Sequence, residues 1–247
     1  MLPTAIALTA ALAGAACEVT SPPRQVALVE LYTSQGCSSC PPADRWLGTL
    51  HDRYGERVVP LSLHVGYWDY IGWKDPFARR EFNERQRLLA AANGSRTVYT
   101  PGVFVQGREL SDWSRGAALD AAIEAAQRRP AQATLTLRVE SIMHSDIGVR
   151  LQASAPAGAR LWLALVESGI TTRVKAGENR GETLRNDHVV RDWHGPFAPG
   201  ASTQTLVLPA GVSDASDGRW AIVALADDAR GSTYQAVRLP LAGCRQP

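Results

Sequence analysis

Residues 26–44 read VALVELYTSQGCSSCPPAD and combine a strand, a cysteine pair and the start of a helix. The run 26–32 is short, apolar and rich in β-branched residues, which predicts a buried strand. Cys37 and Cys40 follow it within a few residues, and two prolines come directly after Cys40. Proline suits the first turn of a helix, where backbone N–H groups have no intrahelical partner. The stretch therefore predicts a strand–CxxC–helix unit.

The surroundings of a CxxC pair indicate whether it is a metal site, a structural bond or a redox centre. A zinc ribbon needs a second such pair, and this chain has none. At the amino end of a helix, unpaired N–H groups and the helix dipole favour the thiolate, which is the attacking form. We expect Cys37 to be the attacking thiol and Cys40, one helical turn later, the resolving thiol. A static structural disulfide is the alternative.

The remaining sequence divides into two parts at about residue 130. Helices are expected at 39–54, 76–92 and 115–128, a strand at 58–65 and a hairpin at 103–110, which together predict an α/β layer fold over residues 24–130. After Pro130 come short β-like segments separated by turn residues, which predict an antiparallel all-β sandwich over residues 131–247. These segments are 134–140, 147–153, 160–167, 189–193, 203–208, 220–226 and 234–239.

Thr100-Pro101 stands just before the expected strand at 103–106. At this point residues 26–129 resemble the thioredoxin superfamily, whose members place such a pair, with a cis proline, beside the CxxC. The resemblance implies that Pro101 is cis and contacts the sulfurs, and a trans turn proline is the alternative. It also implies a buried acid near the resolving cysteine. Glu30 stands almost at that position, with one residue more in the intervening loop, so it is a candidate proton acceptor for Cys40 or a solvent-facing residue.

The loop after the second expected strand, residues 64–73, is unusually aromatic. Parallel strands of one sheet end at the same edge, so we expect this loop to rise beside Cys37. Its aromatic side chains would form an apolar groove for a cysteine-bearing peptide, or they would pack on the 76–92 helix. The candidate substrate-binding residues are Thr100, Tyr67, Trp68, Trp73 and His64. His64 would orient or protonate a thiol, or it is a satisfied polar group at a strand end.

A closer resemblance is to a family of secreted bacterial proteins of unknown function, the domain-of-unknown-function family numbered twelve-twenty-three. The residues that carry it are VELYTSQGCSSCPPAD (29–44), LHVGYWDYIGWKDPFA (63–78), VYTPGVFVQG (98–107) and GENRGETLRNDHVVR (177–191). The resemblance implies a thioredoxin-like domain followed by a β-rich domain, and it brings no established substrate.

The first residues predict export to the periplasm or the outside of the cell. Residues 1–16 are almost wholly apolar and end in small residues, which is typical of a signal peptide, with a buried helix as the alternative. Four cysteines in an exported chain then divide into the close pair and a distant pair. A Cys17–Cys244 disulfide would contribute about 4–5 kcal/mol in the chain-entropy model. Lipidation of Cys17 is the alternative.

These observations predict an envelope or secreted thiol–disulfide oxidoreductase that needs no cofactor. Its partners would be cysteine-containing envelope proteins or a thiol reductant, and the direction of electron flow does not follow from the sequence. The net charge of +2, with no basic cluster, makes nucleic acid a poor partner. No long apolar run follows the N-terminus, so the processed chain should not span a membrane.

Two other functions remain open. A thioredoxin-fold copper protein would bind Cu(I) through Cys37, Cys40 and His64, although such proteins usually separate the cysteines by three residues. A β-sandwich adhesion or scaffold module with a vestigial redox domain is the other, and a Cys37 that solvent cannot reach would favour it.

Overall fold

The structure is a computed structural model that describes residues 17–212, 215, 217–242 and 244. The expected signal peptide, residues 1–16, lies outside the described residues. In chain order the first half contains β1 (Glu18–Thr20), β2 (Ala27–Thr33), α1 (Pro41–Gly48), α2 (Leu50–Tyr54), β3 (Val58–His64), α3 (Arg80–Ala92), β4 (Gly102–Val105), β5 (Arg108–Glu109) and α4 (Gly116–Arg128). Short 3-10 turns at Gly55–Arg57 and Asp69–Ile71 precede β3 and α3.

The second half is built of strands. They are β6 (Thr134–Met143), β7 (Asp146–Ser154), β8 (Arg160–Glu167), β9 (Ile170–Arg173), β10 (Thr183–Asn186), β11 (Val189–Phe197), β12 (Gly200–Val207), β13 (Trp220–Asp227) and β14 (Thr233–Pro240). The segment between residues 170 and 186, which lies between two of the expected β-like segments, forms the two-stranded β9–β10 hairpin.

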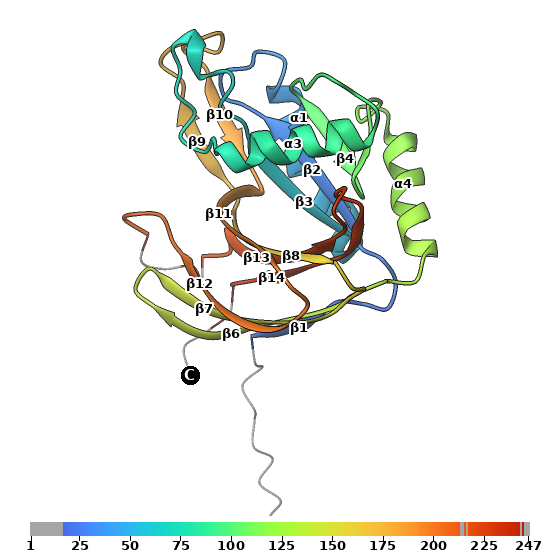
Figure 1. Ribbon diagram of the computed structural model, residues 1–247. Helices are drawn as coiled ribbons and strands as arrows, with labels where there is room; N and C mark the ends of the chain where they lie inside the picture. The colour runs from blue at the N-terminus through green and yellow to red at the C-terminus, as the bar shows by residue number, and fades with distance from the viewer. Residues whose placement is uncertain (1–16, 213–214, 216, 243, 245–247) are drawn as a thin grey trace, which may run out of the picture.

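A mixed eight-stranded sheet in the order β14-β13-β8-β11-β3-β2-β4-β5 runs through both halves. At its centre β2 pairs parallel with β3 and antiparallel with β4. Alternate residues of β2 face opposite sides, as the strand period requires. Val29 and Leu31 belong to the cluster that packs on α1, α2 and α4, whereas Leu28 and Tyr32 belong to the cluster that packs on α3. Figure 1 shows α3 crossing in front of β2 and β3.

The second half does not form a separate sandwich, which corrects the expected division at residue 130. Strands β8, β11, β13 and β14 continue the sheet of the first half, and β11 joins it through a parallel pairing of Val189 with Ser62. Strand β13 is buried at all its positions because both of its faces are covered. Val223 and Leu225 face the α3 side, and Ile222 packs toward the second sheet.

The second sheet has the order β1-β6-β7-β12 and lies below the large sheet in Figure 1. Its apolar residues pack against one face of β8, β13 and β14, and this layer contains the largest cluster of buried apolar side chains among the described residues. Two sheets therefore pack face to face, but each of them contains strands from both halves of the chain. Among the described residues no helix is long and apolar enough to cross a lipid bilayer.

A buried ion-pair network connects the two halves behind α3. The Arg85 guanidinium donates to Glu30 Oε1 at 2.6 Å and to Asp227 Oδ2 at 2.8 Å, and all three side chains are nearly inaccessible to solvent. Asp227 also accepts hydrogen bonds from Arg160 and from the Trp162 indole. Breaking such a pair leaves an unpaired buried charge, so β2, α3 and β13 are held in one arrangement.

Candidate functional site

Cys37 and Cys40 are disulfide-bonded to each other directly before α1. Cys40 is the N-cap residue of this helix, and its carbonyl accepts the N–H of Asp44. Both cysteines have 0% relative exposure, whereas Ser38 and Ser39 between them are exposed. The disulfide thus lies just beneath the surface, and neighbouring segments cover it.

The Thr100–Pro101 peptide lies beside this disulfide. Its peptide bond is cis, as the resemblance to thioredoxin-like proteins implies. The Thr100 carbonyl oxygen is 3.8 Å from the Sγ of Cys37, and Thr100 is buried. Because β4 begins at the next residue, Gly102, the central sheet holds this peptide in place. The cis bond at Pro101 is thus confirmed, whereas the contact with Cys37 comes from the Thr100 carbonyl, and contact of Pro101 itself with the sulfurs stays a prediction.

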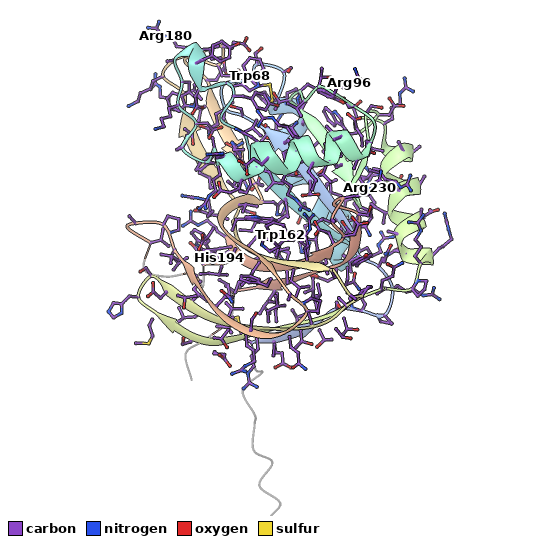
Figure 2. All side chains as sticks on the ribbon, viewed as in Figure 1. Trp68, Arg96, Trp162, Arg180, His194 and Arg230 are labelled. Carbon is purple, nitrogen blue, oxygen red and sulfur yellow. A yellow bond between two sulfur atoms is a disulfide. The ribbon has the colours of Figure 1, made fainter. Side chains whose placement is uncertain are left out.

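Trp68 covers the cysteine loop from the side of the aromatic segment (Figure 2). Its indole Nε1 donates to Thr100 Oγ1 at 2.7 Å. The close approach depends on Gly36, since a Cβ at that position would be 3.1 Å from Trp68 Cβ. Trp68 therefore lies over the residue that immediately precedes Cys37.

The other two aromatic candidates are also fixed inside the protein. The Tyr67 hydroxyl donates to Gln86 Oε1 on α3 at 3.2 Å, and the Trp73 indole donates to Gln35 Oε1 at 3.2 Å. Both rings are partly buried. The aromatic loop lies close to the cysteine loop as expected, and Tyr67 and Trp68 pack on the apolar cluster of α3, which was the alternative to an open groove.

His64 ends β3 and forms a fully buried pair with Asp75. Its Nδ1–H donates to Asp75 Oδ2 at 2.7 Å, and the same oxygen accepts the N–H of Gln35 at 2.7 Å. Burial alone would lower the pKa of His64, but the Asp75 carboxylate outweighs it and raises the pKa above its ordinary value. Burial correspondingly opposes the charge on Asp75, but His64 and backbone N–H groups lower its pKa. Asp75 therefore holds the His64 ring in one orientation and favours its protonated form.

Asp44 is the carboxylate nearest in sequence to Cys40 on the buried face of α1. Residues four apart on a helix are neighbours on its surface, so Asp44 lies on the same face as Cys40. Burial raises the pKa of Asp44 to about 6, although His64 partly offsets the effect. Asp44 Oδ1 and His64 Nε2 are buried without hydrogen-bond partners among the described side chains. Asp44 therefore combines a pKa of about 6 with an unpaired buried oxygen, on the face of α1 that carries Cys40.

Glu30 does not take the expected position, which corrects its assignment as proton acceptor for Cys40. Glu30 shares its sheet face with Leu28 and Tyr32 and pairs with Arg85, whereas α1 packs on the opposite face. The reason is strand parity: a shift of one residue along a strand moves a side chain to the other face. The extra residue before the CxxC therefore directs the Glu30 carboxylate away from the sulfurs.

The turn between β9 and β10 contributes contacts that the sequence did not assign. The Asn179 side-chain amide donates to the carbonyls of Gln35 and Cys37, each at 2.9 Å. Glu178 Oε2 accepts the N–H of Ser38 at 2.9 Å, and this hydrogen bond lowers the Glu178 pKa. Only a cluster of polar residues between Gly177 and Gly181 hinted at these contacts, and that pattern also suits an ordinary solvated turn.

Comparison with known proteins identifies a family whose sequence model covers the residues around the disulfide. The sequence model of the family "Protein of unknown function (DUF1223)" matches residues 28–225, which run from β2 to β13 and include every contact just described. The chain belongs to the DUF1223 family. It is also similar to a crystal structure of a protein from Agrobacterium tumefaciens, with a TM-score of 0.62 and 28% identity over 87% of this chain and 94% of that chain. No curated protein matches the chain.

Outside the span of the DUF1223 match, the expected Cys17–Cys244 pairing is confirmed. The two cysteines are disulfide-bonded with their Cα atoms 5.4 Å apart, which is incompatible with a lipid on the Cys17 sulfur. In the part of the chain that the structure describes, no three His, Cys, Asp or Glu side chains are arranged to hold a metal ion. In this structure the two sulfurs of the alternative copper set bond each other and His64 Nδ1 is paired with Asp75, so Cu(I) binding by Cys37, Cys40 and His64 requires the reduced protein and stays a prediction.

Proposed function

We propose that this DUF1223 chain is a thiol–disulfide oxidoreductase with Cys37 and Cys40 as its redox centre, carried by a thioredoxin-like arrangement of β2, α1, β3 and β4. The observation that carries the proposal is a disulfide at the amino end of α1 with the Thr100 carbonyl 3.8 Å from the Cys37 sulfur. A helix amino end stabilises the thiolate that forms when this bond breaks.

The exchange proceeds in two balanced steps. A thiolate of a partner dithiol attacks Cys37 Sγ and forms a mixed disulfide, while the Cys37–Cys40 bond breaks and Cys40 leaves as a thiolate that takes up a proton. The second partner thiol then attacks the mixed disulfide and releases Cys37. The partner loses two electrons and becomes a disulfide, and the cysteine pair gains them as a dithiol. The same steps in reverse reduce a partner disulfide.

Asp44 and His64 are the groups that exchange protons with the resolving sulfur. A group that gives a proton to one thiolate and then takes one from the next thiol must change protonation close to neutral pH. The Asp44 carboxyl meets this requirement, because its pKa is about 6. Asp75 holds the His64 ring in one orientation and raises its pKa, which favours the protonated form. In this proposal Asp44 has the role that the resemblance to the thioredoxin superfamily implied for Glu30.

We further propose that the protein acts in the periplasm or outside the cell, on cysteine-containing envelope proteins or with a thiol reductant. Two disulfides within the described residues support this setting, because such bonds persist in oxidising compartments.

Substitution of each cysteine tests the proposal. Cys37→Ser should abolish catalysed reduction of insulin disulfides by dithiothreitol, because the attacking sulfur is lost. Cys40→Ser should trap mixed disulfides that mass spectrometry identifies on Cys37. Ser38→Ala, an exposed position between the two cysteines, is the matched control and should keep full activity. Equal and full activity in both cysteine variants contradicts the proposal.

The burial of both sulfurs favours a second candidate, a scaffold or binding module in which Cys37–Cys40 is a structural bond. The two candidates differ in how the bond is reduced. A structural bond yields only when the whole chain unfolds, so its reduction rate cannot exceed the unfolding rate, however high the dithiothreitol concentration. An exchange centre is reduced faster than the chain unfolds, at a rate that rises with the concentration of dithiol.

A further inference from the structure

The disulfide is covered on one side by the turn between β9 and β10, residues 174–182. Between residues 175 and 183, which include most of this turn and the first residue of β10, Asn179 is the one buried residue. Its amide bridges two carbonyls on either side of Gly36, those of Gln35 and Cys37. A single side chain therefore connects the turn to the backbone of the cysteine loop.

A neighbouring contact closes the outer edge of the same loop. The Glu178 carboxylate accepts the N–H of Ser38, the residue next to Cys37. Together the two side chains occupy a carbonyl and an N–H that flank the reactive sulfur. These are the backbone groups that an approaching polypeptide would use for its own hydrogen bonds.

The turn itself has few buried attachments, whereas the strands that carry it are anchored. Asn186 of β10 is buried and accepts a hydrogen bond from the Gln35 side chain, but among residues 175–183 only Asn179 is buried. Segments with few buried contacts open at low free-energy cost, so the turn can open while β10 stays in place. Figure 2 shows Arg180 at the outer tip of the turn, directed away from the protein.

We propose that the 177–181 turn is a displaceable cap on the Cys37–Cys40 disulfide, and that a partner gains access by replacing its contacts. The proposal rests on the exchange function proposed above and specifies its regulation. The partner it implies is a cysteine-bearing polypeptide segment that supplies an acceptor to Ser38 N–H and a donor to the Cys37 carbonyl. The cap explains how a redox centre is fully buried in the resting protein.

The cap is tested by the rate at which dithiothreitol reduces the oxidised full-length protein. One dithiothreitol gives two electrons and two protons: its first thiolate breaks the Cys37–Cys40 bond, and its second thiol closes the dithiothreitol ring and leaves two cysteine thiols. Acid quenching, alkylation and peptide mass spectrometry report this disulfide and Cys17–Cys244 separately, so the second bond serves as an internal reference.

Asn179→Ala should accelerate reduction of Cys37–Cys40 by roughly 5–30-fold, the factor expected when two hydrogen bonds no longer hold the closed state. Arg180→Ala is the matched control, because its exposed side chain makes no hydrogen bond or ion pair among the described residues, and its rate should stay within about twofold of the unaltered protein. Glu178→Ala removes one exposed contact without disturbing the core and should accelerate reduction by about 2–5-fold.

Unchanged rates in Asn179→Ala and Glu178→Ala overturn the cap. Equal acceleration of both disulfides also overturns it, because that result reports general loss of stability. If Asn179→Ala does not fold, the Glu178→Ala rate decides alone. Faster reduction in the variants together with no catalysed exchange of insulin disulfides keeps the cap and rejects the exchange function, so the two proposals fail separately.

Discussion

Replacing Asp44 by asparagine should make the stability of this protein less dependent on pH. In the folded chain burial raises the pKa of this carboxyl from 3.8 to about 6. The folded state therefore holds the proton more tightly than the unfolded chain does, and losing that proton costs folding free energy. Asparagine has nearly the same size but carries no charge at any pH.

The size of the effect follows from the pKa difference. A change of one pKa unit corresponds to 1.36 kcal/mol, so a rise of about two units corresponds to roughly 3 kcal/mol. This cost applies in full above about pH 6, shrinks between about pH 6 and pH 4, and disappears when both states are protonated. The stability of Asp44→Asn relative to the unaltered protein should accordingly increase by about 3 kcal/mol from about pH 4 to pH 8.

Urea denaturation of the oxidised proteins, followed by tryptophan fluorescence at several pH values, measures this difference. Asp112→Asn is the control, because Asp112 is exposed and should give a constant offset. The reasoning is refuted if the Asp44→Asn curve stays parallel to that of the unaltered protein across this pH range. It is equally refuted if the unaltered protein gains stability as the pH rises through 6 and the variant does not.

Three further variants test the fold. Arg85→Met leaves the buried Glu30 carboxylate without its cation and removes one of the two arginines that pair with Asp227, so it should lower the free energy of unfolding by about 3–5 kcal/mol in urea titrations, and a loss below 1 kcal/mol would show that the network is solvated. Cys17→Ser with Cys244→Ser opens a bond across a sequence separation of 227 and should cost about 5 kcal/mol in the chain-entropy model, measured by thermal unfolding; a double variant as stable as the oxidised protein contradicts this. Gly107→Ala places a Cβ 2.3 Å from the Gly231 carbonyl at positive φ, so calorimetry should show a midpoint lower by roughly 4–8 °C, and an unchanged midpoint would mean that the two hairpin turns separate easily.

The local signals in the sequence were sufficient for the cysteine loop. The apolar run before Cys37, the prolines after Cys40 and the Thr100-Pro101 pair predicted a strand, a helix start and a contact, and each lies where expected. These features depend on neighbours in sequence or on a well-marked motif. The Cys17–Cys244 pairing followed from counting cysteines.

Long-range arrangement was harder to predict because its signals are weak. Strand β13 reads WAIVALAD, an apolar run without polar alternation, and such a run indicates a strand with both faces covered. A solvent-facing sandwich strand would alternate, so this run was the available sign that the second half joins the large sheet. A single additional loop residue moved the Glu30 carboxylate to the other face of the sheet, and no local pattern in the sequence indicated this shift. Asp75 and Asn179 contact the site from segments that are distant in sequence, so their positions could not be predicted locally.

Asn179 lies 142 positions after Cys37, and this separation has a consequence for the growing chain. A ribosome adds about 5–20 residues per second. Roughly 10–30 s therefore pass between the synthesis of Cys37 and that of Asn179, whose side-chain amide donates to the Cys37 carbonyl. During this interval the hydrogen bond from Asn179 is missing, and the cysteine loop has only those contacts that come from segments made earlier, such as Trp68. The bonds that hold the turn on the loop are therefore among the last to become available as the chain is made.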